Sequence, residues 1–193
     1  MLSLPPFLIF LSGALLIPFV PERWQGWLSF SVAVIALLNF ILIPHGIYWE
    51  VALLDHKLIL GRIDTLGYLF CLLFHIAAII ATLFAIHVRD PIQNISALLY
   101  AGAAVGATLA GDLLTLFIFW EIMAIASSFL IWVRRAPQSN STGLRYLIVQ
   151  VVSGLLLLSG TIILYSETGS IAFEAIDLQS IGGKFIFLAF GIK

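Results

Sequence analysis

Long apolar runs separated by short polar stretches dominate the pattern of this chain. A helix that crosses hydrocarbon needs about 20 mainly apolar residues, with a range of roughly 17 to 25. Runs near this length predict six membrane-spanning helices, and a seventh that begins near Lys184 and is cut off where the sequence stops. The six predicted spans are Leu4–Val20, Trp27–Ile43, Leu66–Ile86, Ile95–Ala110, Leu113–Val133 and Tyr146–Tyr165.

Two connections between the predicted spans have a character of their own. The stretch HGIYWEVALLDHKLILGRID partly alternates apolar and polar residues, which predicts a small β-hairpin at about 46–63 with its turn at Asp55–His56. The stretch SETGSIAFEAIDLQSIGGK is polar and rich in glycine, which predicts an interfacial loop or a short amphipathic helix. The predicted fold class is therefore an all-α, polytopic membrane bundle with one small hairpin outside the membrane.

Composition supports a membrane protein and excludes several functions. Of the 193 residues 62% are hydrophobic and 10% are charged, and the mean hydropathy is +1.13, more than a soluble core accommodates. A net charge of −1 gives no basic surface for nucleic acid. The single cysteine, Cys71, excludes an intrachain disulfide and a cysteine-ligated iron–sulfur cluster. Without a nucleotide-binding or hydrolase motif, we expect no catalytic site of its own and no cofactor.

The basic residues predict how the chain is oriented, because Lys and Arg are retained on the cytoplasmic side. Five of them follow the first, third and fifth spans, whereas three follow the second and sixth. The five are Arg23, Arg89, Arg134, Arg135 and Arg145, and the three are Lys57, Arg62 and Lys184. The N-terminus is therefore predicted to lie outside the cell.

Small and polar residues predict helix contacts. On the fourth span a small residue recurs every four positions, and the fifth span carries a small-residue patch, so these two helices are predicted to pack closely. The sixth span places several hydrogen-bonding or small residues near one face. In chain order these sets are Gly102, Gly106 and Ala110; Ala124, Ser127 and Ser128; and Gln150, Ser153, Gly154 and Thr161.

Glu121 is the first candidate functional residue, because it interrupts the apolar run FIFWEIMAIASS. An acid at the centre of a membrane helix costs about 2.5 to 3.5 kcal/mol on insertion scales, so it must face protein, a cavity or a counter-charge. A buried carboxyl whose charge depends on a movable cation is suited to relaying protons. The alternative is a neutral, hydrogen-bonded Glu that ties helices together.

Lys193 is the candidate counter-charge. It follows Lys184 by about 13 Å along a straight helix axis, which places it well inside the bilayer. The alternative is a terminal lysine that extends its amine to the membrane surface.

The stretches DLLTLFIFWEIMAIASSFLIW, LRYLIVQVVSGLLLLSG, ETGSIAFEAI and FLAFGIK resemble the antiporter-like subunits that Mrp-type Na+/H+ antiporters share with respiratory complex I. The D subunits of the antiporters resemble the chain most, and the M, N and L subunits of complex I are related. The resemblance implies that Glu121 and Lys193 form an ion pair that moves a proton. It also implies lesser roles on the proton path for Arg145 and Asp112, and for Asp112 a helix-capping role is an equal alternative.

The family has about fourteen helices, so the resemblance implies that this chain is an N-terminal fragment. Residues 1–92 would hold three helices and the hairpin, and residues 93–193 would begin the proton-translocating repeat. The implied function is that of a proton-translocating subunit, D-like, in a hetero-oligomeric Na+/H+ antiporter of the bacterial inner membrane. The alternatives are a proton-pumping subunit of complex I or of a membrane hydrogenase, and a structural remnant that does not transport.

Two histidines lie on the third predicted helix or at its cytoplasmic end. His75 lies mid-span and is either a helix contact or a further group on the proton path. His87 lies about 18 Å away along the helix, too far to share one metal or haem with it.

Overall fold

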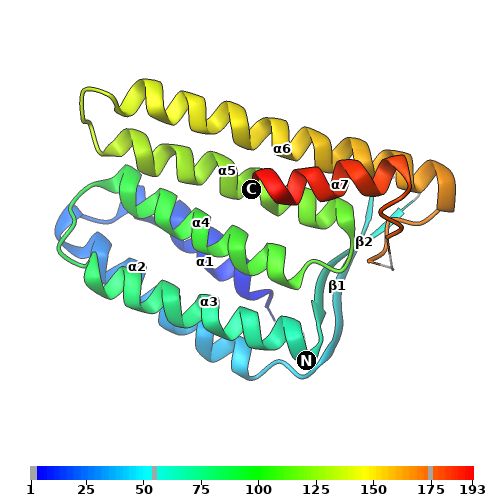
Figure 1. Ribbon diagram of the computed structural model, residues 1–193. Coiled ribbons are helices and arrows are strands. Elements are labelled where there is room, and N and C mark those ends of the chain that lie inside the picture. The colour runs from blue at the N-terminus through cyan, green and yellow to red at the C-terminus, as the bar shows by residue number, and fades with distance from the viewer. Residues whose placement is uncertain (1–3, 54–55, 174–175) are drawn as a thin grey trace.

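A computed structural model describes residues 4–53, 56–173 and 176–193 (Figure 1). Within these ranges the chain forms seven α-helices, one short 3₁₀ helix (η1) and a two-stranded hairpin. In chain order they are α1 Pro6–Leu16, η1 Ile17–Phe19, α2 Glu22–Ile41, β1 Gly46–Leu53, β2 His56–Ile63, α3 Thr65–Phe84, α4 Pro91–Leu109, α5 Leu113–Val133, α6 Ser139–Thr168 and α7 Ile181–Ile192. The predicted helical membrane bundle is confirmed.

The helices differ in length, and the first is shorter than predicted. Five helices, α2 to α6, are long and apolar enough to cross a membrane, whereas α1 with η1 and α7 are shorter. The first predicted span is limited by Pro5 and Pro6 at its start and by Pro18, which sits in the 3₁₀ helix. Proline lacks the N–H that a continuing helix needs. The 14 residues of Pro6–Phe19 rise roughly 20 Å, less than the ~30 Å hydrocarbon core.

The bundle has two hydrophobic cores with α4 at its middle (Figure 1). The first core joins α1, α2, α3 and α4, and Phe119 of α5 also enters it. The second core joins α5, α6 and α7 around Trp120, Leu157 and Ile186. Because α5 contributes to both cores, its position is set by both halves of the bundle.

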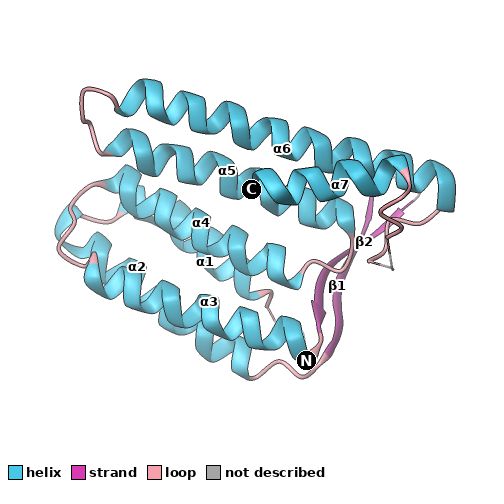
Figure 2. Cartoon of the chain, viewed as in Figure 1, coloured by secondary structure: helices cyan, strands magenta, loops and turns pink. Residues whose placement is uncertain are grey.

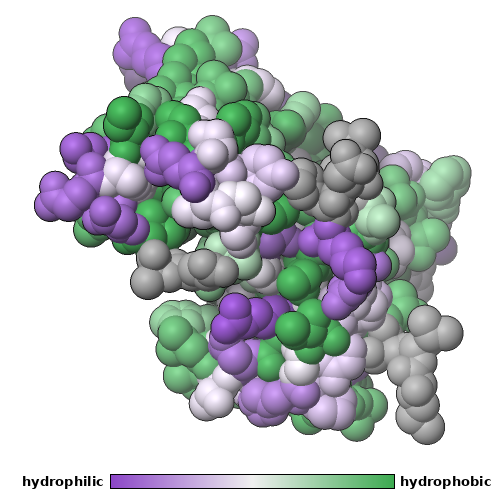
Figure 3. All heavy atoms as spheres, turned by 90° about the vertical axis from the view of Figure 1, so that its right-hand side faces the viewer, coloured by the Kyte–Doolittle hydropathy of each residue, from purple (hydrophilic) through white to green (hydrophobic). Residues whose placement is uncertain are grey.

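The predicted hairpin is present at one end of the bundle (Figure 2). Its strands are antiparallel, with Gly46 opposite Ile63 and Ala52 opposite Lys57. The predicted turn residue Asp55 lies outside the described residues. The end of the bundle that carries the hairpin faces the viewer in Figure 3, where hydrophilic side chains gather among apolar ones. This distribution fits an end that leaves the membrane.

Glycines allow three close helix contacts. A Cβ on Gly26 of α2 would overlap the backbone carbonyl of Ile86, just after α3. A Cβ on Gly106 of α4 would overlap the ring of Phe119 on α5, so the predicted α4–α5 packing is confirmed. Gly102 instead faces α1 at Phe10, because a spacing of four residues turns slowly around the helix and brings Gly102 to a different neighbour.

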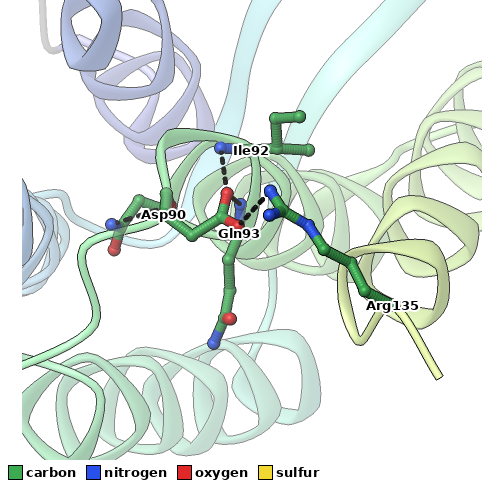
Figure 4. Close-up of polar contacts among 5 residues, drawn as sticks. Asp90, Ile92, Gln93 and Arg135 are labelled. Carbon is green, nitrogen blue, oxygen red and sulfur yellow. Dashed lines mark hydrogen bonds and ion pairs between the residues drawn. The ribbon is translucent and has the colours of Figure 1, made fainter.

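The opposite end of the bundle is held by an ion pair (Figure 4). Asp90 caps α4 by accepting from the backbone N–H groups of Ile92, at 3.0 Å, and Gln93, at 3.3 Å. Its other oxygen accepts from Arg135 Nη2 at 3.2 Å, just beyond the end of α5. Arg135 has a φ of 50°, in the left-handed region that is unfavourable for a residue with a side chain. The α5–α6 turn is therefore attached to the start of α4.

Replacing Gly26 with alanine should destabilise the bundle. The new Cβ would meet backbone atoms that cannot move aside, and overpacking of this kind costs about 1–3 kcal/mol. The measurement is the midpoint of thermal unfolding in detergent. Gly191→Ala is the matched control, because no atom lies within 4 Å of a Cβ at that position. Equal midpoints for the two variants would contradict the close contact at Gly26.

Candidate functional site

Glu121 lies near the middle of α5. Asp112 caps the helix, and Glu121 follows Leu113 by about 12 Å of axial rise. An α-helix satisfies its own backbone polar groups, so the side chain of Glu121 is the polar group that the surroundings must accommodate.

The carboxyl of Glu121 points at α6. A Cβ on Gly154 would overlap the carboxylate, so the acid occupies the space that the missing side chain leaves. Its Oε1 is buried and has no hydrogen-bond partner among the described residues. A buried acceptor without a donor is costly, which makes this oxygen a place where a proton or a donor is stabilised.

Lys193 reaches the same part of α5 from α7. Its Nζ donates to the backbone oxygen of Trp120 at 3.3 Å and lies 4.7 Å from the centre of the Trp120 ring. A cation over an indole face is attracted by the ring's quadrupole. Glu121 and Lys193 interact electrostatically but make no ion pair within 4.0 Å. The structure thus brings the two predicted residues into one site, with Trp120 as the direct partner of the lysine.

Helix α7 is held against α6 and α5. Ser153 of α6 donates to the backbone oxygen of Ala189 at 2.9 Å. Gly160 of α6 lies against Ile186, and the ring of Phe190 packs on Trp120 with 5.0 Å between ring centroids. The contacts place the Lys193 end of α7 beside the middle of α5, as Figure 1 shows.

Asp112 lies at the hairpin end of the bundle and is almost fully buried. It accepts from the N–H of Thr115 and from the Thr115 hydroxyl, both at 2.7 Å, and so caps α5. It also accepts from the N–H of Ile59 on β2 at 2.7 Å. The capping alternative is confirmed, and a transport role for Asp112 stays a prediction.

The other two predicted path residues lie apart from Glu121. His75 is fully buried in α3, with Nδ1 2.8 Å from the backbone oxygen of Cys71 and its ring stacked on Phe40 at 5.1 Å. Within the described chain α3 does not contact α5, because α4 lies between them. Arg145 is exposed in the second turn of α6. Their roles on a proton path stay predictions.

Two residues take a more direct part in the site than the sequence indicated. Trp120 is only 4% exposed and accepts from Lys193 through its backbone oxygen. Gln150 of α6 is 5% exposed, and its buried Oε1 has no hydrogen-bond partner among the described residues. The signal for Gln150 was its place one turn from Gly154 on one helix face.

A cavity of about 350 Å³ lies away from this site. It is lined mainly by residues of α3 and α4, half of the lining being alanine, and it includes neither Glu121 nor Lys193. Within the described ranges no three His, Cys, Asp or Glu side chains gather as metal ligands.

Comparison with known families and proteins gives consistent matches. Residues 110–193 match the family described as "NADH:quinone oxidoreductase/Mrp antiporter, TM". The A subunit of the Na(+)/H(+) antiporter of Alkalihalophilus pseudofirmus is 26% identical over 196 residues, which cover 90% of this chain and 24% of that protein. The D subunit from the same organism is 38% identical over 66 residues, which cover 34% of this chain and 13% of that protein. The chain thus spans a quarter or less of these relatives.

Solved structures show the same fold. The Mrp complex from Dietzia sp. DQ12-45-1b matches 97% of this chain and 22% of its own chain, with a TM-score of 0.80 and 21% identity. NADH-bound respiratory complex I from Thermus thermophilus matches 100% of this chain and 43% of its own, with a TM-score of 0.79 and 23% identity. The homologues are subunits of multisubunit membrane assemblies, and this chain is a membrane protein.

Replacing Asp112 with alanine should loosen the hairpin end. Three donors would lose their shared acceptor, and each buried group left unpaired costs about 1–3 kcal/mol. Hydrogen exchange should accelerate at Ile59 and at the start of α5. Asp64→Ala is the matched control, since Asp64 is an exposed cap of α3 that accepts one backbone bond, from Gly67. Similar losses of stability in both variants would contradict a special role for Asp112.

Proposed function

We propose that the chain is part of a proton-translocating subunit of a multisubunit cation/proton antiporter. Two similarities support this: residues 110–193 match the NADH:quinone oxidoreductase/Mrp antiporter family, and the chain is similar to the A and D subunits of Na(+)/H(+) antiporters. Glu121 would take up and release the proton. Lys193 would favour its release by approaching the carboxylate and its uptake by withdrawing.

One observation carries this proposal: a buried carboxyl oxygen without a hydrogen-bond donor lies one residue from the backbone oxygen that binds Lys193. In a low-dielectric site a small displacement of a cation changes the stability of a nearby carboxylate strongly. The arrangement therefore suits reversible protonation. A Glu that served only to join helices would be expected to hydrogen-bond across the interface.

The subunit type is a finer proposal. We predicted a D-like subunit, and the D relative has the higher identity, whereas the A relative matches more of this chain. We retain D-like as the proposal, with A-like as the alternative that the extent of the match supports. The division into residues 1–92 and 93–193, the bacterial inner membrane, exchange of Na+ and an outside N-terminus are part of the same proposal.

The alternative within the family is a subunit of complex I or of a membrane hydrogenase, in which electron transfer elsewhere drives proton movement. The fold supports it equally, because complex I shares this fold. Neighbouring genes discriminate between the two: small hydrophobic subunits indicate an antiporter, and iron–sulfur proteins indicate a redox complex.

Replacing Glu121 with glutamine should abolish Na+-dependent proton flux. Glutamine has the same shape but carries no transferable proton, and proton-transfer groups contribute about 100-fold or more to rate. Flux is measured by a pH-sensitive dye in inverted vesicles that carry the complete complex with its full-length subunit. Glu167→Gln is the control, because Glu167 is exposed in the last turn of α6. Wild-type flux in Glu121→Gln would contradict the proposed function.

The double replacement of Glu121 and Lys193 by leucine separates transport from a purely structural role. Two apolar residues remove both charges of the site together and leave neither without its partner, so assembly should be retained. Transport should be lost, measured in the same vesicles with complex content checked by immunoblotting. A structural remnant predicts retained transport.

A further inference from the structure

The helix contacts locate Gln150 relative to Glu121. Gly154 of α6 lies against Glu121 of α5, and Gly143 of α6 lies against Trp132 of α5. The contact thus moves eleven residues back along α6 as it moves eleven residues forward along α5. The two helices are therefore antiparallel in a fixed register. Gln150 lies one turn from Gly154, and therefore about one turn along the bundle axis from the level of Glu121.

The contacts with α7 locate Gln150 relative to Lys193. Ser153 donates to Ala189, while Gly160 lies near Gly182 and Ile186, so α6 and α7 are also antiparallel. Lys193 is one turn beyond Ala189, and Gln150 is three residues before Ser153. The two residues consequently lie at the same level of the bundle.

Gln150 also points to the correct side. On a helix of 3.6 residues per turn, its direction falls between that of Gly154, which faces α5, and that of Ser153, which faces α7. Gln150 is only 5% exposed, and within the described ranges its Oε1 has no hydrogen-bond partner. It is directed at the space between Glu121 and Lys193.

The hydrogen-bond donors and acceptors around this space are complementary. Glu121 Oε1 and Gln150 Oε1 are both buried acceptors to which no described residue donates. The Lys193 ammonium has three donors, and Trp120 accepts one of them. Two unpaired acceptors thus lie within one helix turn of a cation that has donors to spare.

We propose, on the basis of the proposed function, that the Lys193 ammonium has two binding positions and that Gln150 is the positioning residue of the second. In the first position the ammonium donates to the backbone carbonyl of Trp120 and lies over its ring. In the second it donates to Glu121 Oε1 and Gln150 Oε1, directly or through one water. Gln150 gives the cation a second partner beside the carboxylate, so the ammonium is held there while Glu121 is ionised.

Gln150→Met and Gln150→Ala test this role in the complete complex. Methionine fills the same volume with apolar atoms, whereas alanine leaves room for water to replace the amide. We expect methionine to reduce the maximal Na+-dependent flux about tenfold, the effect of one hydrogen bond to a charged group, and alanine to reduce it less than about threefold. A role in packing alone predicts the reverse order, because alanine leaves the larger cavity.

Thr161→Val is the matched control. Thr161 is buried on the same helix, but its hydroxyl donates to Leu157 of its own backbone at 2.8 Å, so flux should be unchanged. Infrared difference spectra add a readout that packing does not move: the C=O band of protonated Glu121 should shift in Gln150→Met and remain in place in Thr161→Val.

Wild-type flux and an unshifted C=O band in Gln150→Met would contradict the second binding position. A larger loss of flux in Gln150→Ala than in Gln150→Met would contradict it too. Loss of flux in Glu121→Gln alongside either result would leave the proposed function intact. Wild-type flux in Glu121→Gln would remove the proposed function itself.

Discussion

The close approach of α5 and α6 at Gly154 is the constraint on which the site depends. A side chain at that position would occupy the volume of the Glu121 carboxylate. The glycine therefore allows the carboxyl of Glu121 to lie between two helices, with its Oε1 buried. Because α5 also contributes Phe119 to the first core and Trp120 to the second, the position of the acid is fixed by both halves of the bundle.

The surroundings of Glu121 combine apolar enclosure with a few polar atoms that are left unpaired. Buried polar groups are normally satisfied, and exceptions require an explanation. Among the described residues, Glu121 and Gln150 each have an unpaired buried acceptor and Trp120 an unpaired N–H donor, all at the junction of α5, α6 and α7. A site that must bind a proton at one moment and a cation at another cannot satisfy every acceptor in a single state, so incomplete pairing in one state is a physical requirement of the proposed exchange.

The sequence predicted most of the fold because apolar run length and alternation report directly on membrane helices and hairpins. The α5 bounds Leu113–Val133 and the hairpin at 46–63 agree with the structure. Glu121 stood out because a charge in an apolar run is conspicuous. The first helix was predicted too long, since hydropathy does not register the effect of proline on helix geometry. The roles of Trp120 and Gln150 depend on the register between helices, which no single helix pattern contains.

The two ends of α7 are held unequally. At its start, Gly182 packs closely on Gly160 and Gly183 on the backbone of Asp177, and the preceding segment is joined to Leu113 through the backbone oxygen of Ile171. At its other end Ser153 donates to Ala189, the ring of Phe190 packs on Trp120, and Lys193 donates to the backbone oxygen of Trp120. The start of α7 is thus fixed by close backbone contacts, whereas its other end is held through the side chains of Ser153, Phe190 and Lys193. A tilt too small to disturb the glycine contacts would carry Lys193 through the largest displacement, at the level of the acid.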